Sequence, residues 1–184
     1  MTDTETFLGI MTICVVLVTL SYFGFFDWLR GNKDKVQFFQ TVVPDDGRVI
    51  EGIFCDITGM LIQGKVTHAN GQIEEGKFDR FEGQLIEGKL TSPEGMVEEG
   101  TREKLTRTLI QGKRTSPDGM VEEGTFDGFT RTLIEGKLTY PGGDVEEGTR
   151  DEETRRLIKG KKIFPDGRIE EGKFDKDTGK LIEE

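Results

Sequence analysis

The chain has 184 residues, of which 34% are hydrophobic and 33% are charged, and its net charge at pH 7 is −10. All but four of the 35 acidic residues and all but three of the 25 basic residues lie in residues 37–184, which leaves a net charge of −9 there. This balance argues against nucleic-acid binding and against electrostatic docking on anionic lipid. The two cysteines, Cys14 and Cys55, are too few to form a disulfide framework.

The N-terminal segment contains twenty consecutive uncharged residues, Phe7 to Phe26. As a helix, this run would be about 30 Å long, which matches the hydrocarbon thickness of a bilayer. A cleavable signal peptide is the alternative, but the chain starts with acidic residues, and the run ends in aromatic residues rather than at a small-residue cleavage site. We therefore predict a tail at residues 1–6 and a retained transmembrane helix at residues 7–29, anchored by Phe7 and Trp28.

Basic residues flank the predicted span on one side only. Arg30, Lys33 and Lys35 follow it, and none precedes it. The positive-inside rule then places the N-terminus outside and the C-terminal repeats on the cytoplasmic side, or on the matrix side in a mitochondrion. We expect an integral protein of a bacterial or mitochondrial inner membrane, with lipid around the anchor and a short linker at residues 30–36.

The rest of the chain, residues 37–184, follows a twelve-residue period marked by glycine. Two half-units alternate, one typified by Val121–Phe126 (VEEGTF) and the other by Leu133–Leu138 (LIEGKL), so the full repeat has 24 residues. Self-similarity at such a period indicates a repeat array, in which each unit packs on its neighbours. The glycines in phase are Gly52, Gly64, Gly76, Gly88, Gly100, Gly112, Gly124, Gly136, Gly148, Gly160 and Gly172.

Turn signals separate these short segments. One kind of turn is tight, as in Pro93-Glu94-Gly95, and the other is looser, as in Asp175–Gly179, and it degrades to Asp127–Arg131 elsewhere. Strands of six or seven residues between such turns predict consecutive antiparallel hairpins, whereas no window is long enough for a helix. The predicted fold is an all-β repeat: one elongated antiparallel sheet of stacked β-hairpins, preceded by one transmembrane α-helix.

Centring each turn predicts the register of the strands. Gly88 then lies opposite Gly100, and Glu99 lies opposite both Lys89 and Lys113, so one face carries a stripe of alternating Glu and Lys. Opposite charges that face each other stabilise a pair by about 0.2–1 kcal/mol and specify register. The other face is predicted to be moderately apolar and to contact a protein partner. Its expected pairs are Phe78 with Ile86, Phe126 with Ile134, and Phe174 with Ile182.

The short unit Ile134-Glu135-Gly136-Lys137-Leu138 resembles the Y-E-G-x-[FW] core of MORN repeats. This chain has a slightly longer period, Ile or Glu in place of the family's Tyr, and Arg102 and Arg150 in place of an aromatic in two repeats. The loop Asp175–Leu181 also resembles an antitoxin-like hairpin repeat of the YwqK type. Over residues 37–184, the MORN resemblance implies an elongated sheet that organises partners at membranes. It also implies phospholipid contact in some segments, but the basic and aromatic groups used for that contact are sparse here.

Residues that could perform chemistry are few and isolated. His68 is the single histidine, Cys55 follows an apolar strand, and Ser92 and Ser116 precede prolines in turns. Consecutive glutamates such as Glu122-Glu123 point to opposite faces of a strand, so they cannot act as one carboxylate pair. No phosphate-binding glycine motif is present in the sequence. We therefore expect no enzyme activity, cofactor, metal ion or small-molecule substrate.

These observations lead to three functional hypotheses. The first is a non-catalytic, single-pass membrane scaffold or accessory subunit, which would use its sheet to contact other subunits of a larger complex, for example a respiratory or other energy-converting assembly. The second is a freestanding, membrane-tethered adaptor that binds a protein. The third is an immunity or antitoxin protein of the YwqK type.

Overall fold

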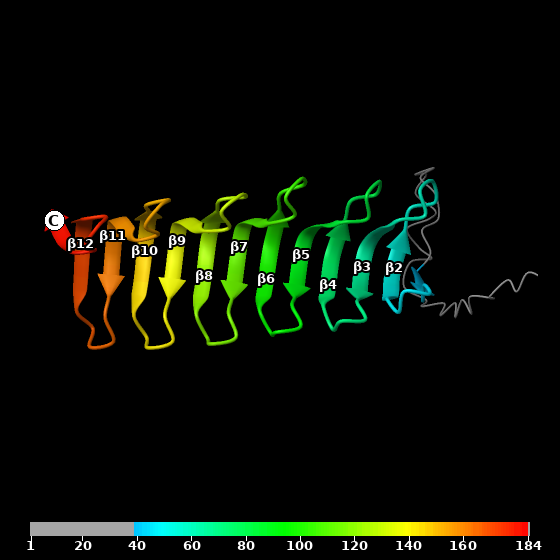
Figure 1. Ribbon diagram of the computed structural model, residues 1–184, viewed down its shortest axis with the longest axis horizontal. Coiled ribbons are helices and arrows are strands. Elements are labelled where there is room, and N and C mark those ends of the chain that lie inside the picture. Colours follow the sequence, from blue (N-terminus) through cyan, green and yellow to red (C-terminus); the bar gives the residue numbers. More distant parts are fainter. Residues whose placement is uncertain (1–38, 184) are drawn as a thin grey trace, which may run out of the picture.

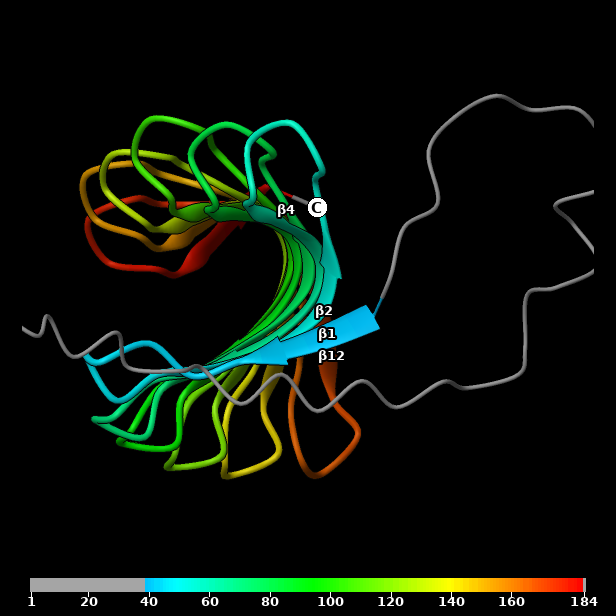
Figure 2. The same cartoon turned by 90° about the vertical axis from the view of Figure 1, so that its right-hand side faces the viewer.

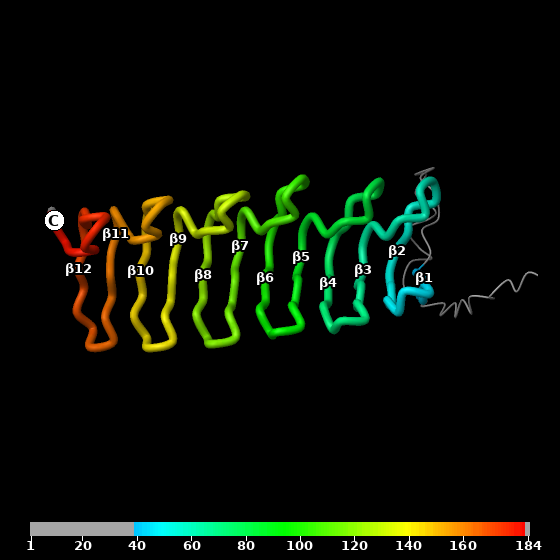
Figure 3. Tube along the Cα trace, viewed as in Figure 1, coloured from blue at the N-terminus to red at the C-terminus, as the bar shows by residue number. Residues whose placement is uncertain are grey.

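A computed structural model describes residues 39–183 as one antiparallel sheet of thirteen strands (Figure 1). The strands follow one another in chain order across the sheet, as the tube in Figure 3 shows. This confirms the predicted single sheet of stacked hairpins. The predicted tail, the helix at residues 7–29 with Phe7 and Trp28, and the linker at 30–36 lie outside the described residues. Within residues 39–183, no helix is long and apolar enough to cross a membrane.

The strand bounds match the two alternating half-units of the sequence. The strands are β1 (Phe39–Val42), β2 (Val49–Phe54), β3 (Leu61–Thr67), β4 (Ile73–Phe78), β5 (Leu85–Thr91), β6 (Val97–Arg102), β7 (Leu109–Thr115), β8 (Val121–Phe126), β9 (Leu133–Thr139), β10 (Val145–Arg150), β11 (Leu157–Ile163), β12 (Ile169–Phe174) and β13 (Leu181–Glu183).

The sheet is curved and has two chemically different rims. Viewed along its length, it has a C-shaped cross-section, with connections along both rims (Figure 2). Tight turns join each odd-numbered strand to the next strand, and we call this side the turn rim. Six-residue loops, such as residues 79–84 and 127–132, join each even-numbered strand to the next, and we call this side the loop rim. At a strand spacing of about 4.8 Å, the sheet is roughly 55–60 Å long.

Pairs of glycines face each other at the middle of the strands, as predicted. Gly124 of β8 pairs with Gly136 of β9, and their φ angles are 149° and 142°. A Cβ atom on Gly124 would lie 2.1 Å from the carbonyl oxygen of Glu135, which is closer than any real contact of this kind. Glycine is required here because the neighbouring backbone occupies the space of a side chain and because L-residues rarely adopt such a φ.

A β-bulge beside each six-residue loop changes the register from the predicted one. The bulge between Thr125 and Phe126 places Leu133 opposite Phe126, so the predicted pairing with Ile134 is wrong. The reason is that the bulge sets two residues of one strand against one of the other, which shifts only the pair next to the loop. The pairs on the other side of the bulge, such as Gly124 with Gly136, keep the predicted register. The same shift replaces Ile86 by Leu85 opposite Phe78, and Ile182 by Leu181 opposite Phe174.

The loops of the loop rim share one backbone geometry despite their different sequences. In the loop at 79–84, Gly83 N–H donates to the Asp79 carbonyl oxygen at 2.7 Å. In the loop at 127–132, Arg131 closes the same turn on Asp127 at 2.9 Å, with a φ of 61°. The sequence pattern degrades in this loop but the geometry is kept, because Arg131 adopts the left-handed conformation that glycine adopts more readily elsewhere.

Candidate interaction surfaces

One face of the sheet presents charged side chains beside the glycine rows, and we call it the charged face. Glu99 of β6 lies opposite Lys89 of β5 and Lys113 of β7, which confirms the predicted alternation. These side chains are exposed. Lys161 Nζ lies 3.1 Å from Glu147 Oε2, whereas within residues 39–183 Glu99 forms no ion pair with its two lysines. The alternating pattern therefore remains available to another molecule.

The charged face contains an open hollow of about 710 Å³ over strands β6 to β10. Charged and polar side chains line it, together with the bare backbone of the glycine rows. The lining residues are Glu99, Gln111, Gly112, Lys113, Glu123, Gly124, Gly136, Lys137 and Glu147. Because the lining carries both signs of charge and no large apolar side chain, the hollow suits a polar protein surface better than an apolar ligand.

The opposite face holds the core, and we call it the packed face. Phe78, Phe126 and Phe174 are only 4%, 2% and 3% exposed, and each lies against the leucine across the bulge. Of the other three predicted contact residues, Ile86 and Ile134 are half-buried, and Ile182 is exposed. The six residues therefore do not form one accessible face, since the three phenylalanine rings are covered within the chain itself. Contact of a partner with this face stays a prediction.

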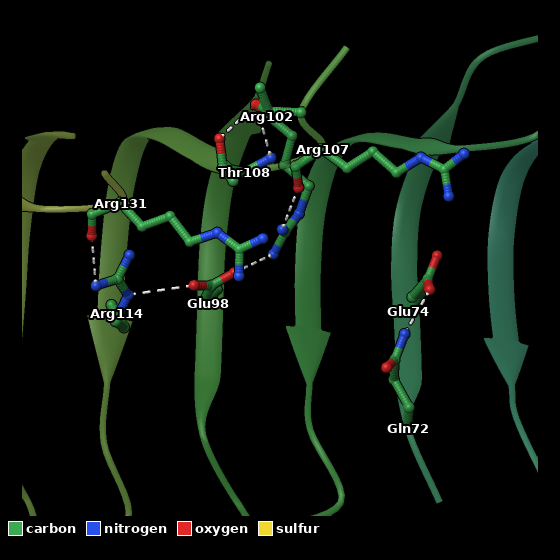
Figure 4. A network of polar contacts seen from close by, with 9 residues as sticks. Gln72, Glu74, Glu98, Arg102, Arg107, Thr108, Arg114 and Arg131 are labelled. Atoms are coloured by element: carbon green, nitrogen blue, oxygen red, sulfur yellow. Dashed lines mark hydrogen bonds and ion pairs between the residues drawn. The ribbon is translucent and has the colours of Figure 1, made fainter. Parts of the chain in front are cut away.

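A buried ionic network crosses the packed face at the middle of the sheet (Figure 4). Arg102 Nη2 lies 2.7 Å from Glu98 Oε2, and Arg102 Nη1 donates to the Arg107 carbonyl oxygen at 2.9 Å. Arg114 Nε lies 3.2 Å from the other carboxylate oxygen of Glu98. The side chains of Arg102 and Glu98 are 5% and 12% exposed, so each charge depends on the other for solvation.

The same network continues into the next repeat through Arg114. Its Nη1 lies 3.1 Å from Glu122 Oε2. The same Nη1 donates to the Arg131 carbonyl oxygen at 3.0 Å, so Arg114 ties a strand to a loop (Figure 4). Its guanidinium carbon lies 4.7 Å from the centre of the Phe126 ring, a cation–π contact. Arg114 thus joins the buried charges to the apolar core.

From β4 onward, phenylalanine and arginine alternate at the end of successive even strands, which gives this part of the core a period of 48 residues. Phe78, Phe126 and Phe174 alternate with Arg102 and Arg150. Arg150 repeats the network, because its Nη2 lies 2.7 Å from Glu146 Oε2, four residues earlier. The sequence reasoning noted both arginines as departures from an aromatic pattern but missed their role. A glutamate four residues before each arginine was the signal that could have revealed it.

Carboxylates organise the loops of the loop rim. Asp127 Oδ1 accepts hydrogen bonds from Phe129 N–H at 3.0 Å, from Thr130 N–H at 2.5 Å and from the Thr130 hydroxyl at 2.8 Å. These bonds, first those from the Thr130 backbone, hold the pKa of Asp127 below its ordinary value. Asp79 and Asp151 have lowered pKa values for the same reason.

The residues that could perform chemistry remain apart from one another. His68 Nε2 lies 3.0 Å from Glu74 Oε1. This oxygen also accepts from Gln72 Nε2 at 2.8 Å (Figure 4). The pKa of the Cys55 thiol is lowered by hydrogen bonds from Thr58. Within the described residues, no group of three or more His, Cys, Asp and Glu side chains could hold a metal ion.

A second hollow, of about 610 Å³, lies on the packed face near the C-terminal end. Its lining includes Tyr140, Glu146, Lys162 and Phe164. Lys162 Nζ lies 3.3 Å from Glu146 Oε1 and donates to the Gly179 carbonyl oxygen at 3.0 Å. Burial raises the pKa of the Tyr140 hydroxyl. These polar groups are already paired with one another, which is the arrangement of a structural network.

Comparisons with known proteins do not identify a family. No family model matches the chain, and no curated protein matches it. Among solved structures, the chain is similar to one described as "Structural analysis of the microcephaly protein CPAP G-box domain suggests a role in centriole elongation", with 18% identity. The match covers 72% of this chain and 79% of that chain, with a TM-score of 0.18. A likeness at this level supports no conclusion about fold or function.

Proposed function

We propose that the protein is a non-catalytic, membrane-anchored scaffold or accessory subunit that binds other subunits of a membrane complex through the charged face of its sheet. The observation that favours this function is the charged face itself. It is exposed along the sheet, and in residues 39–183 no other element packs on it. The uncharged run at Phe7–Phe26 supplies the proposed anchor.

The pattern of charges favours a protein partner over a nucleic acid or a small molecule. Glu and Lys alternate from strand to strand, at intervals of about 4.8 Å, so the face has a strong local pattern but little net charge. A nucleic acid would require an excess of basic groups. A protein surface with the inverse alternation would match the pattern, and such complementarity provides specificity and register more than affinity.

The test is co-purification of the full chain in a mild detergent, first as wild type and then as a charge swap. The variant Glu123→Lys/Lys137→Glu keeps the net charge but inverts the pattern at the floor of the hollow, and we expect it to lose its stoichiometric partners. The matched control, Glu94→Lys/Lys176→Glu, makes the same exchange between exposed residues of the two rims. This control should retain its stoichiometric partners. Thermal unfolding of both variants checks that the sheet is intact.

The outcomes separate the candidate functions. Stoichiometric co-purification with several membrane subunits, lost in the swap variant alone, supports the accessory subunit. A monodisperse monomer in detergent would exclude that role. Capture of one soluble protein would instead identify a tethered adaptor, and capture of a toxin that it neutralises would identify an immunity protein. Equal retention of partners by both variants would refute binding through the charged face.

A further inference from the structure

Large apolar side chains project from the tips of four successive loops on the loop rim. Each occupies the third position of its six-residue loop. Their exposed fractions are 77% for Ile57, 61% for Phe81, 89% for Leu105 and 87% for Phe129. Single exposed apolar residues are common on proteins, but four at equivalent positions of successive loops form a regular row that water does not favour.

An aspartate at the first position of the loop fixes the backbone at two of these tips, Phe81 and Phe129. Asp79 Oδ1 accepts from Phe81 N–H at 2.8 Å and from Glu82 N–H at 2.9 Å, and Asp127 does the same in its loop. Neighbouring loops are also bonded to each other, since the Thr108 hydroxyl donates to the Gly128 carbonyl oxygen at 2.7 Å. The loops that carry the apolar tips are therefore held by hydrogen bonds within and between them.

The row occupies one end of one rim. Consecutive tips are two strands apart, or about 10 Å, so the four tips extend over about 30 Å. In the last two loops, the third position is acidic, with Glu153 and Asp177. The turn rim differs throughout, because the tips of its turns are acidic or small, as at Glu94 and Asp118. The apolar row is therefore confined to the first four of the six loops of the loop rim.

The chain enters the sheet on this same rim and at this same end. The first strand begins at Phe39, which pairs with Ile53 near the loop end of β2. The 38 residues before Phe39 include the uncharged run Phe7–Phe26. A bilayer that holds this run would lie next to the loop rim, closest to Ile57, and the apolar tips are found where they would meet it.

We propose that the loop rim rests on the bilayer, with Ile57, Phe81, Leu105 and Phe129 inserted in its interfacial region. The occupant is a zwitterionic lipid surface, because basic and acidic groups, such as Arg80 and Glu82, stand together between the tips. Insertion of apolar side chains, rather than attraction to anionic headgroups, holds the rim there. The inference rests on the proposed membrane anchor. The inference goes beyond the anchor because it orients the sheet, with the turn rim directed away from the membrane.

Tryptophan quenching by brominated phosphatidylcholine tests the contact in the full chain reconstituted in phosphatidylcholine vesicles. The wild type contains one tryptophan, Trp28, which reports on the anchor. In a Trp28→Phe background, Phe129→Trp reports on the loop rim and Asp118→Trp reports on the turn rim. Both sites are exposed, so the sheet should tolerate either change, and circular dichroism checks that it does.

We expect quenching and a blue shift of the emission at position 129 and neither at position 118. Adding Ile57→Ser, Phe81→Ser and Leu105→Ser to the Phe129→Trp protein should weaken the quenching, since the rim loses three of its inserted side chains. Quenching of Trp28 without quenching at position 129 would overturn the rim contact and leave the anchor standing. Quenching at position 129 without quenching of Trp28 would support the rim contact and refute the anchor. Quenching at neither position would refute both.

Discussion

Replacing Gly124 by alanine is expected to destabilise the sheet more than replacing a turn glycine, because it adds a clash with the neighbouring strand to a strained backbone. The φ of 149° costs an L-residue about 1–3 kcal/mol. The added Cβ would lie 2.1 Å from the carbonyl oxygen of Glu135 and 2.7 Å from the Cα of Gly136. Strand β9 would have to withdraw, and each backbone hydrogen bond that lengthens forfeits about 1 kcal/mol. The expected total is about 3–5 kcal/mol.

The matched control is Gly119→Ala in the tight turn that precedes the same strand. Gly119 also has a positive φ, 91°, but nothing lies within 4 Å of its added Cβ, so only backbone strain of about 1–2 kcal/mol is expected. Urea unfolding followed by far-UV circular dichroism compares the two variants. Amide hydrogen exchange shows whether protection is lost in β8 and β9, because repeat proteins can open locally. Equal destabilisation by the two substitutions would refute the inter-strand contact as the reason for the glycine rows.

Three further predictions concern the core and the loops. Arg102→Ala should lower the unfolding free energy by about 3 kcal/mol, because it leaves a buried carboxylate and a loop carbonyl short of a partner; urea unfolding measures this, and a loss below 1 kcal/mol would contradict the network. Phe126→Ala should cost about 3–5 kcal/mol, whereas Phe129→Ala, at an exposed loop tip, should change stability by less than about 0.5 kcal/mol in the same assay. Asp127 has a folded-state pKa below the ordinary 3.8, so it stabilises the fold above that pH and the contribution is lost as the pH falls through the lowered pKa. The melting temperature should fall on acidification through that range, and Asp127→Asn should reduce the fall; an unchanged pH profile would contradict the role of its hydrogen bonds to Thr130.

The periodic features of the sheet could be predicted from the sequence because they are local. Glycine every twelve residues and turn residues every 24 determine where strands begin and end. Centring a symmetric turn then determines which residues face each other, so the pairing of Gly88 with Gly100 and of Glu99 with Lys113 is correct. Antiparallel neighbours in a hairpin leave few other arrangements.

The residue pair next to each six-residue loop could not be placed in this way. One bulged residue shifts the pairing from Ile134 to Leu133, and a bulge depends on the backbone angles of the whole loop rather than on one residue type. Arg131, for example, adopts a left-handed conformation that residue preferences assign to glycine. The predicted pairing of Phe78, Phe126 and Phe174 is wrong at this point, because a shift of one position decides which side chain lies opposite each ring.

The sequence by itself determined the period, the strands, their order and the charged face, because each depends on neighbours along the chain or across one turn. The tertiary structure decided which polar groups are buried and which apolar groups are not. Arg102 enters the core because Glu98, on the same face of the same strand, neutralises it there. Phe129 remains outside because Asp127 binds the loop backbone and turns the aromatic ring away from the sheet. Burial depends on how the strands and loops pack together. Hydrophobicity alone would place Arg102 in solvent and Phe129 in the core, and both assignments are wrong.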